Sequence, residues 1–166
     1  MRRSREDRNP DTSTFHFHNQ NPKGKYTTDC LIRAISLGTG IEYNQVVMDL
    51  AKLQCETGLD DGDSKLYTKY LYSKGWVKRS QPRKYDGTKY TGAEFCRHLQ
   101  FHYRKRDGNV IAHIGGHHIV AIVPTCEGDG MEDRFKVCDT WNSTEYCIGN
   151  YWVKAGSRID NSKTGI

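Results

Sequence analysis

Long apolar runs are absent from the sequence, and none approaches the ~20 residues that a helix needs to cross a bilayer. The basic opening, MRRSREDRNPDTS, is not followed by the apolar stretch that a secretory signal requires. The first absence argues against a membrane protein and the second against export. We therefore expect a cytoplasmic protein that makes no contact with a membrane.

A cysteine pattern typical of a disulfide framework or a metal site is also absent. The cysteines are scattered, and no two of them form a CxxC pair. In a reducing cytosol such thiols stay free, and most are expected to pack as small buried apolar side chains. A functional cysteine must therefore be identified from its place in a helix or strand, among Cys30, Cys55, Cys96, Cys126, Cys138 and Cys147.

Internal repeats and low-complexity segments are lacking, and the 166 residues correspond to about one domain. Residues 1–14 are polar and rich in arginine, which predicts a flexible basic arm. We expect the folded domain to span residues 15–154 and a polar tail to follow at 155–166. The formal net charge of +5 is too small to identify an anionic partner.

Helical patterns dominate the first two-thirds of the folded segment. The apolar block CLIRAISL at 30–37 predicts a compact helix that is apolar on all sides and therefore buried. Thr28 or Asp29 is a suitable cap for its first turn, and Gly38 for its end. Three further helices are predicted by apolar stripes or by a capping box, at 43–54, at 64–74 and from Thr91 and Glu94 onward.

The pattern then changes to β-branched and aromatic runs bounded by Gly, Pro, Asn and Asp, which is typical of strands. Hairpin turns are expected at Gly115 and Gly116 and at 127–130. This order, helices first and an antiparallel sheet second, is that of an α+β fold whose helices lie on one side of the sheet. The expected strands are 109–114, 118–124, 134–139 and 146–153, with a further short strand at 15–18.

Cys30 stands at the predicted start of a helix, which distinguishes it from the other cysteines. The free N–H groups and the dipole at a helix N-terminus favour an anion, so they lower the pKa of a thiol. His118 opens a strand and Asp139 ends the next one, and neighbouring antiparallel strands can bring such ends together. Nucleophile, base and orienting carboxylate in this order form the triad of a cysteine hydrolase.

Each member of this triad has a structural alternative. A cysteine in an apolar helix is most often a packing residue, a histidine that opens a strand is most often structural, and an aspartate after a strand is most often a turn residue. His117 and His118 can exchange roles, since they are adjacent. Asn142 can replace Asp139, because an amide oxygen also accepts a hydrogen bond from imidazole.

Two neighbouring residues have two interpretations each. Arg33 lies one helical turn after Cys30 and can stabilise a thiolate, but an ion pair with a buried acid is the more common role of such an arginine. Trp141 follows Asp139 closely and can either shield the contact between Asp139 and His118 from water or pack in the core.

Three sequence blocks together resemble the papain-like cysteine peptidase superfamily, namely DCLIRA, HHIVAI and DTWNS. The similarity covers roughly residues 15–153. It is greatest to compact members, such as the bacteriocin-processing double-glycine peptidases, and to small proteins of bacteria and their phages. The resemblance implies a papain-like fold, in which a buried helix bearing Cys30 packs on a C-terminal antiparallel sheet. It also implies that Cys30 is the nucleophile, His118 the base and Asp139 the orienting carboxylate.

One position departs from the family's pattern. Papain-like enzymes usually carry a glutamine shortly before the cysteine to help stabilise the oxyanion, and the corresponding residue here is Gly24. The resemblance leaves Gln20, Asn19 or Asn21 to supply this side-chain donor, and Gln20 is our choice. The backbone N–H of Cys30 would be the second donor.

Two other functions are compatible with parts of the sequence. Histidines gather at 16–18 and 113–118, and zinc binds His and Cys, but no closed ligand spacing is present. The basic arm, KRSQPRK at 78–84 and YRKR at 103–106 can contact phosphates, although no motif for binding nucleic acid is present.

The sequence thus predicts a cytoplasmic cysteine peptidase or isopeptidase-like hydrolase of a bacterium or phage, with a protein or peptide as substrate. The predicted site residues are Cys30, His118, Asp139 and Gln20, and neither a metal nor a cofactor is expected. An acyltransferase with the same triad is one alternative. A non-catalytic adaptor of papain-like fold, or a nucleic-acid-binding protein that uses the basic surface, is another.

Overall fold

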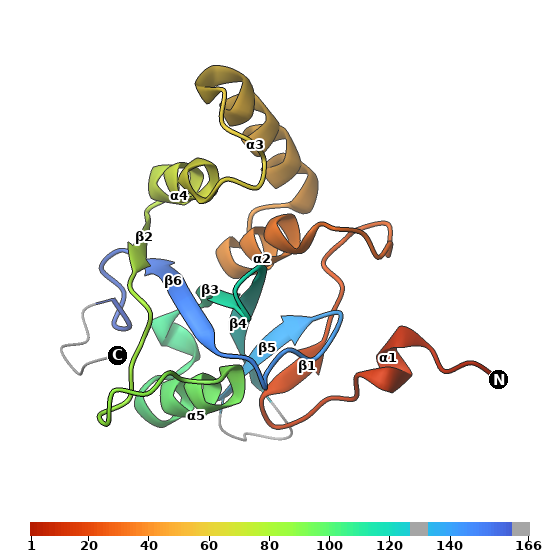
Figure 1. Cartoon of the computed structure of the whole chain (residues 1–166), viewed down its shortest axis with the longest axis vertical. Helices are drawn as coiled ribbons and strands as arrows, with labels where there is room; N and C mark the ends of the chain where they lie inside the picture. Colours follow the sequence, from red (N-terminus) through yellow and green to blue (C-terminus); the bar gives the residue numbers. More distant parts are fainter. Residues whose placement is uncertain (127–132, 161–166) are drawn as a thin grey trace.

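A six-stranded sheet forms the centre of the protein in the computed structural model, which describes residues 1–126 and 133–160 (Figure 1). The strands are β1 (Phe15–Phe17), β2 (Trp76–Arg79), β3 (Val110–Ile114), β4 (His118–Cys126), β5 (Asp133–Asp139) and β6 (Ile148–Lys154). They lie in the order β1-β5-β4-β3-β6-β2. All neighbouring pairs are antiparallel except β1 and β5, which run parallel. The sheet is therefore mixed, whereas the sequence predicted an antiparallel one.

Helices cover both faces of this sheet. They are α1 (Arg5–Arg8), α2 (Cys30–Thr39), α3 (Tyr43–Thr57), α4 (Ser64–Ser73) and α5 (Gly92–His102), with a short 3-10 helix η1 (Lys105–Asp107). The expected α+β class is confirmed. The expectation that all helices lie on one side is wrong for α5, which packs on the face opposite α2 (Figure 1). No helix in the described ranges is long and apolar enough to cross a bilayer.

Two apolar cores, one on each face of the sheet, hold these layers together. On one face, Phe95 and Leu99 of α5 are fully buried against the strands. On the other face, Ile35, Val46 and Leu71 bring α2, α3 and α4 into a second buried cluster. Each such side chain contributes ~1.5–3 kcal/mol on burial. The second core therefore fixes α2, the helix that begins with the candidate nucleophile, against the sheet.

Close packing also fixes the position of α2. The helix passes the expected end at Gly38 and stops at Gly40, whose φ of 79° lies in the left-handed region that favours glycine. Gly38 instead lies where α2 approaches β3, because a Cβ at this position would be 2.5 Å from Cγ1 of Ile111. The two glycines thus have different roles, one in packing and one in ending the helix.

The turn between β3 and β4 sets where His118 lies. Gly115 and Gly116 have φ values of 64° and 87°, a conformation that glycine adopts without strain. The expected glycine hairpin is therefore confirmed. Because of this tight turn, β4 begins at His118, directly opposite Ile114.

The N-terminal segment, which the sequence predicted to be a flexible basic arm, contains a short helix that contacts the domain. Its helix α1 places Arg5 against the domain, where Nη1 of Arg5 donates to Oγ1 of Thr140 at 3.2 Å. The same guanidinium lies 4.3 Å from the centre of the Tyr26 ring. These contacts hold part of residues 1–14 beside the end of β5, because Thr140 immediately follows that strand.

Two expected segments lie outside the described residues, at least in part. They are the hairpin at 127–130 and residues 161–166 of the tail. The first part of that tail lies against the domain, since Ile159 is buried and Asp160 accepts a hydrogen bond from Nε of Arg79 at 2.8 Å. Ile159 and Asp160 of the predicted tail thus contact the domain.

Replacing Gly38 by alanine tests how closely α2 must approach the sheet. Alanine gains up to ~1 kcal/mol of helix propensity over glycine, but overpacking a core costs ~1–3 kcal/mol. Since Ile111 is fully buried, we expect Gly38→Ala to lower the free energy of unfolding by ~1 kcal/mol, measured by urea titration. Gly62→Ala is the control, because a Cβ there meets nothing within 4 Å. Equal stabilities of the two variants would contradict the close packing.

Candidate active site

Cys30 opens α2 and lines a cleft of about 550 Å³. The N-cap residue Asp29 makes no side-chain hydrogen bond to the first turn of the helix, so it does not cap the N–H groups beside the sulfur. Tyr67, His113 and His117 also line the cleft. The other lining residues are the aliphatic Leu31, Ile32, Val47, Leu50, Ala51 and Ile119, together with Thr28, Asp29, Gln54, Asp61 and Gly62.

His118 lies between Cys30 and Asp139. Its Nε2 is 2.5 Å from Oδ2 of Asp139, and the interaction of its ring with the Cys30 thiol contributes to the raised pKa of His118. Because Nε2 contacts the carboxylate, Nδ1 is the ring nitrogen left for an interaction with the sulfur. The three groups come from the start of α2, the start of β4 and the end of the adjacent strand β5. The structure thus brings together the three residues that the sequence singled out.

The charges of this group favour an ion pair. Burial opposes ionisation of the Cys30 thiol, but the hydrogen bond and charge of His118, with the N–H of Ile119, outweigh it and lower the pKa of the thiol. Burial alone would lower the pKa of His118, but the hydrogen bonds to Asp139 and Cys30 raise this pKa to about 9. Both shifts stabilise a thiolate beside an imidazolium at neutral pH.

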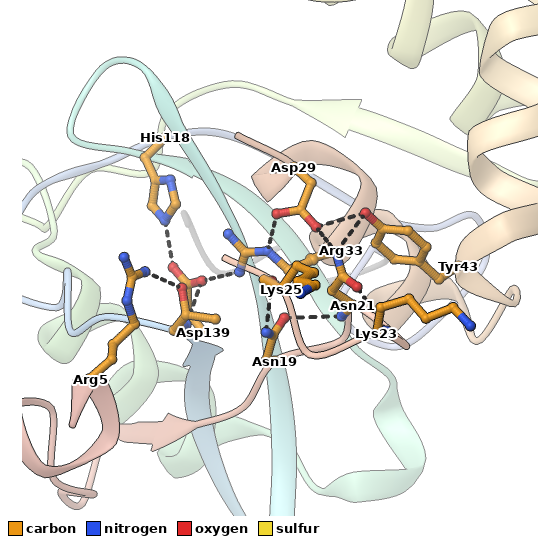
Figure 2. A network of polar contacts seen from close by, with 11 residues as sticks. Arg5, Asn19, Asn21, Lys23, Lys25, Asp29, Arg33, Tyr43, His118 and Asp139 are labelled. Carbon is orange, nitrogen blue, oxygen red and sulfur yellow. Dashed lines mark hydrogen bonds and ion pairs between the residues drawn. The ribbon is translucent and has the colours of Figure 1, made fainter. Parts of the chain in front are cut away.

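Asp139 is shared between His118 and Arg33 (Figure 2). Its Oδ1 accepts from Nη1 of Arg33 at 2.5 Å and from the backbone N–H of Thr140 at 2.7 Å. The residue is only 2% exposed, and such burial raises the pKa of a carboxyl. The contacts with His118 and Arg33 outweigh burial and hold the pKa of Asp139 below its usual value. The carboxylate therefore stays ionised and orients the imidazole.

Arg33 extends this network into α2 and the preceding loop. Its Nε donates to Oδ1 of Asp29 at 2.8 Å. The other oxygen of Asp29 accepts from the Tyr43 hydroxyl at 2.7 Å and from the Asn21 amide at 3.0 Å (Figure 2). Of the two roles considered for Arg33, pairing with buried acids is thus confirmed. The charge of Arg33 also adds to the lowering of the Cys30 pKa.

The other neighbours of the triad have distinct positions. Trp141 packs its indole against the His118 ring, with 4.9 Å between the ring centres. His117 is exposed at the wall of the cleft. The side-chain oxygen of Asn142 accepts from the backbone N–H and the hydroxyl of Thr144. The contact with the His118 ring is therefore made by the aspartate, with the indole beside it.

Gln20 is not brought to the Cys30 sulfur, which corrects the assignment of its amide to the oxyanion. Its Nε2 donates to Oγ of Ser36 at 3.1 Å, and its Oε1 lies 2.7 Å from Nε2 of His18. Ser36 lies about 9 Å along the helix axis from Cys30, at 1.5 Å per residue. The side-chain amide of Asn19 likewise donates to the carbonyl oxygen of Lys25, and that of Asn21 donates to Asp29 and to the Tyr43 hydroxyl.

Two cleft residues were not identified as a pair from the sequence. The Tyr67 hydroxyl lies 2.6 Å from Nε2 of His113, and both residues share the cleft with Cys30. The apolar stripe at 64–74 predicted a helix there but no role for Tyr67, and the histidine-rich hairpin suggested His113 only as a metal ligand. The histidine-rich hairpin was the signal in the sequence that pointed to His113. The contact with Tyr67 depends on how α4 packs relative to the sheet.

The sequence also raised a metal site and nucleic-acid binding as rival functions. In the part of the chain that the structure describes, no group of three or more His, Cys, Asp or Glu side chains could hold a metal ion. Within the basic segments, Arg79 bonds to Asp160, and Arg104 donates to the backbone carbonyls of Gln100 and Tyr103. These arginines thus make contacts within the protein.

A scan against protein-family models, a search of curated proteins and a search of solved structures found no match. No neighbour therefore confirms the papain-like assignment. The candidate site rests on its own geometry, a thiol at a helix N-terminus joined through an imidazole to a buried carboxylate.

Arg33 stands between two buried carboxylates, so its loss should cost more than the loss of a surface arginine. In Arg33→Met, Asp29 and Asp139 would lose the cation between them. We expect the free energy of unfolding, measured in urea at pH 7, to fall by ~3–5 kcal/mol. Arg79→Met is the control, since its partly exposed ion pair should contribute only ~0–1 kcal/mol. Similar losses in both variants would contradict a central role for Arg33.

Proposed function

We propose that the protein is a cysteine-type hydrolase that cleaves an amide or isopeptide bond. Cys30 is the nucleophile, His118 the general base and Asp139 the orienting carboxylate. The observation that carries this proposal is the unbroken series of contacts from thiol to imidazole to buried carboxylate, with the thiol in a cleft. Ion pairs that serve only stability also shift pKa values, but they do not require a nucleophile at an uncapped helix start.

In the proposed reaction each group has one role. The Cys30 thiolate adds to the substrate carbonyl, so a C–S bond forms and the carbonyl π pair moves onto oxygen. When this intermediate collapses, the C–N bond breaks, and the leaving amine takes the proton from Nδ1 of His118. Neutral His118 then takes a proton from the water that attacks the thioester, and Cys30 departs as thiolate. Asp139 stays ionised throughout and holds Nε2.

The arrangement of elements supports the papain-like class within this proposal. A cysteine-bearing helix packs on the strand pair β3 and β4, and the histidine opens the second of these strands. An indole beside the imidazole limits the access of water to the carboxylate contact. A reducing compartment such as the cytoplasm would keep the Cys30 thiol in its reactive form.

The cleft also favours a class of substrate. The aliphatic part of its wall and its volume of about 550 Å³ can accept an apolar side chain beside the scissile carbonyl. A protein or peptide segment presents such a side chain and the amide bond together. We therefore favour a peptide or protein substrate with an apolar residue next to the cleaved bond.

Alkylation by iodoacetamide tests the ion pair. We expect Cys30 to react at pH 6, well below the ordinary thiol pKa of ~8.5, because the interactions with His118 lower the pKa of the thiol. In His118→Ala the contacts that lower this pKa are lost, so the rate at pH 6 should fall at least ~10-fold and recover as the pH rises. Mass mapping identifies the modified residue. Cys96 should stay unlabelled, since burial raises its pKa to about 12. A wild-type rate that appears only above pH ~8 would contradict the pair.

Cleavage of a peptide library, followed by mass spectrometry of the new termini, tests the reaction itself. We expect new termini with the wild type and none with Cys30→Ala, and a rate ~10²–10⁴ lower in His118→Ala. Activity should fall as the pH rises through about 9, where the His118 imidazolium loses its proton. Cys55→Ser, which removes an exposed thiol, should keep full activity. Cleavage that persists in Cys30→Ala would contradict the proposal. A reactive Cys30 without any cleavage would favour the non-catalytic adaptor.

A further inference from the structure

The proposed reaction places a negative charge on the carbonyl oxygen of the substrate, and this charge needs hydrogen-bond donors. One donor is available in the first turn of α2, whose N–H groups Asp29 does not cap. The Gln20 amide is not a second donor, because Ser36 and His18 hold it. Another side chain that lines the cleft can supply the second donor.

Tyr67 of α4 has the position that this role requires. It lines the same cleft as Cys30 and is only 6% exposed. Burial, and after it the negative charge of Cys30, raise the pKa of Tyr67 to about 12. The phenol is therefore protonated at neutral pH, and it lies near enough to the sulfur to be affected by its charge.

The Tyr67 ring and hydroxyl are both held in place. The hydroxyl lies 2.6 Å from Nε2 of His113, and the ring packs edge-on against Trp152 at 5.6 Å between centres. Burial, with a smaller effect of the Lys78 charge, lowers the pKa of His113, so its ring is neutral at pH 7. When its single proton is on Nε2, the ring donates to the phenol oxygen. The O–H of Tyr67 is then free to donate into the cleft.

We infer that the Tyr67 hydroxyl is the second oxyanion donor of this site and that His113 is the residue that positions it. This inference rests on the proposed function and concerns its acylation step. As the Cys30 thiolate adds to the carbonyl carbon, the C–S bond forms and the π pair becomes a lone pair on oxygen. Tyr67 donates a hydrogen bond to that oxygen and keeps its proton. On collapse the C=O bond re-forms, and the leaving group departs with its bonding pair.

Two reagents separate oxyanion stabilisation from the reactivity of the sulfur. 4-Nitrophenyl acetate acylates a thiolate through an oxyanion and releases 4-nitrophenolate. Iodoacetamide alkylates the same sulfur by displacing iodide, and no oxyanion forms. Both rates are measured at Cys30 of the full chain, with the exposed Cys55 and Cys147 replaced by serine. The ratio of acylation to alkylation then reports the strength of the oxyanion donors.

Tyr67→Phe keeps the ring against Trp152 and removes only the hydroxyl. We expect the ratio to fall ~10²-fold, the usual cost of losing one oxyanion donor, while the alkylation rate stays nearly constant. Tyr70→Phe is the matched control on the same helix, because the Tyr70 hydroxyl donates to Asp49 at 2.7 Å and does not line the cleft. It should leave both rates unchanged. His113→Leu should lower the ratio, and His113→Gln, which keeps an amide N–H, should restore part of it.

An unchanged ratio in Tyr67→Phe overturns the inference, as does an equal fall in both rates. A wild-type ratio no higher than that of N-acetylcysteine also overturns it, because the protein would then give the oxyanion no stabilisation. If circular dichroism shows that Tyr67→Phe does not fold, the two His113 variants decide the question. Failure of the proposed function is recognised separately, by a high acylation ratio in a protein that cleaves no peptide.

Discussion

The buried carboxylate of Asp139 is the constraint on which the site depends. It is 2% exposed, and a carboxylate removed from water in this way is stable only with charged or hydrogen-bonded partners. Arg33 supplies one partner from α2, and His118 supplies the other from β4. Because these partners belong to different layers, the contacts that stabilise the buried charge also fix the cysteine-bearing helix against the sheet. Stability and alignment of the candidate triad therefore have the same physical cause.

The sharing of Asp139 also balances the charges around Cys30. A carboxylate whose whole charge acted on His118 would bind the imidazolium proton more tightly. Arg33 offsets part of that charge, and its own positive charge favours the Cys30 thiolate. Even so, the hydrogen bonds to Asp139 and Cys30 raise the pKa of His118 to about 9. The network thus favours the ion pair from both sides, with a cation near the thiolate and an anion behind the imidazolium.

The parts of the fold that could be predicted from the sequence are those with local signals. The capping box of Thr91 and Glu94 is present as expected, and the glycine pair makes the β3–β4 turn. The candidate triad could also be proposed from the sequence, because its residue types stand at the ends of predicted helices and strands. The direction of the Gln20 amide and the contact between Tyr67 and His113 could not be predicted from the sequence. Both depend on which side chains meet across the layers, which no spacing along one helix or strand encodes.

The start of α2 shows how the acidic network bears on the chemistry of the helix. An aspartate at the N-cap ordinarily accepts from the first N–H groups and contributes ~0.5–2 kcal/mol. Asp29 stands at this position, but Arg33, Tyr43 and Asn21 occupy its oxygens, and it makes no such bond. The helix therefore gives up part of its own stability, while the N–H groups beside Cys30 stay available to an anion. An N-cap aspartate that does not bond to the first turn departs from the usual helix pattern, and such departures are expected at functional or strained sites. Asp29 thus binds Arg33 in place of the first N–H groups of α2, and these N–H groups remain available to a thiolate or an oxyanion.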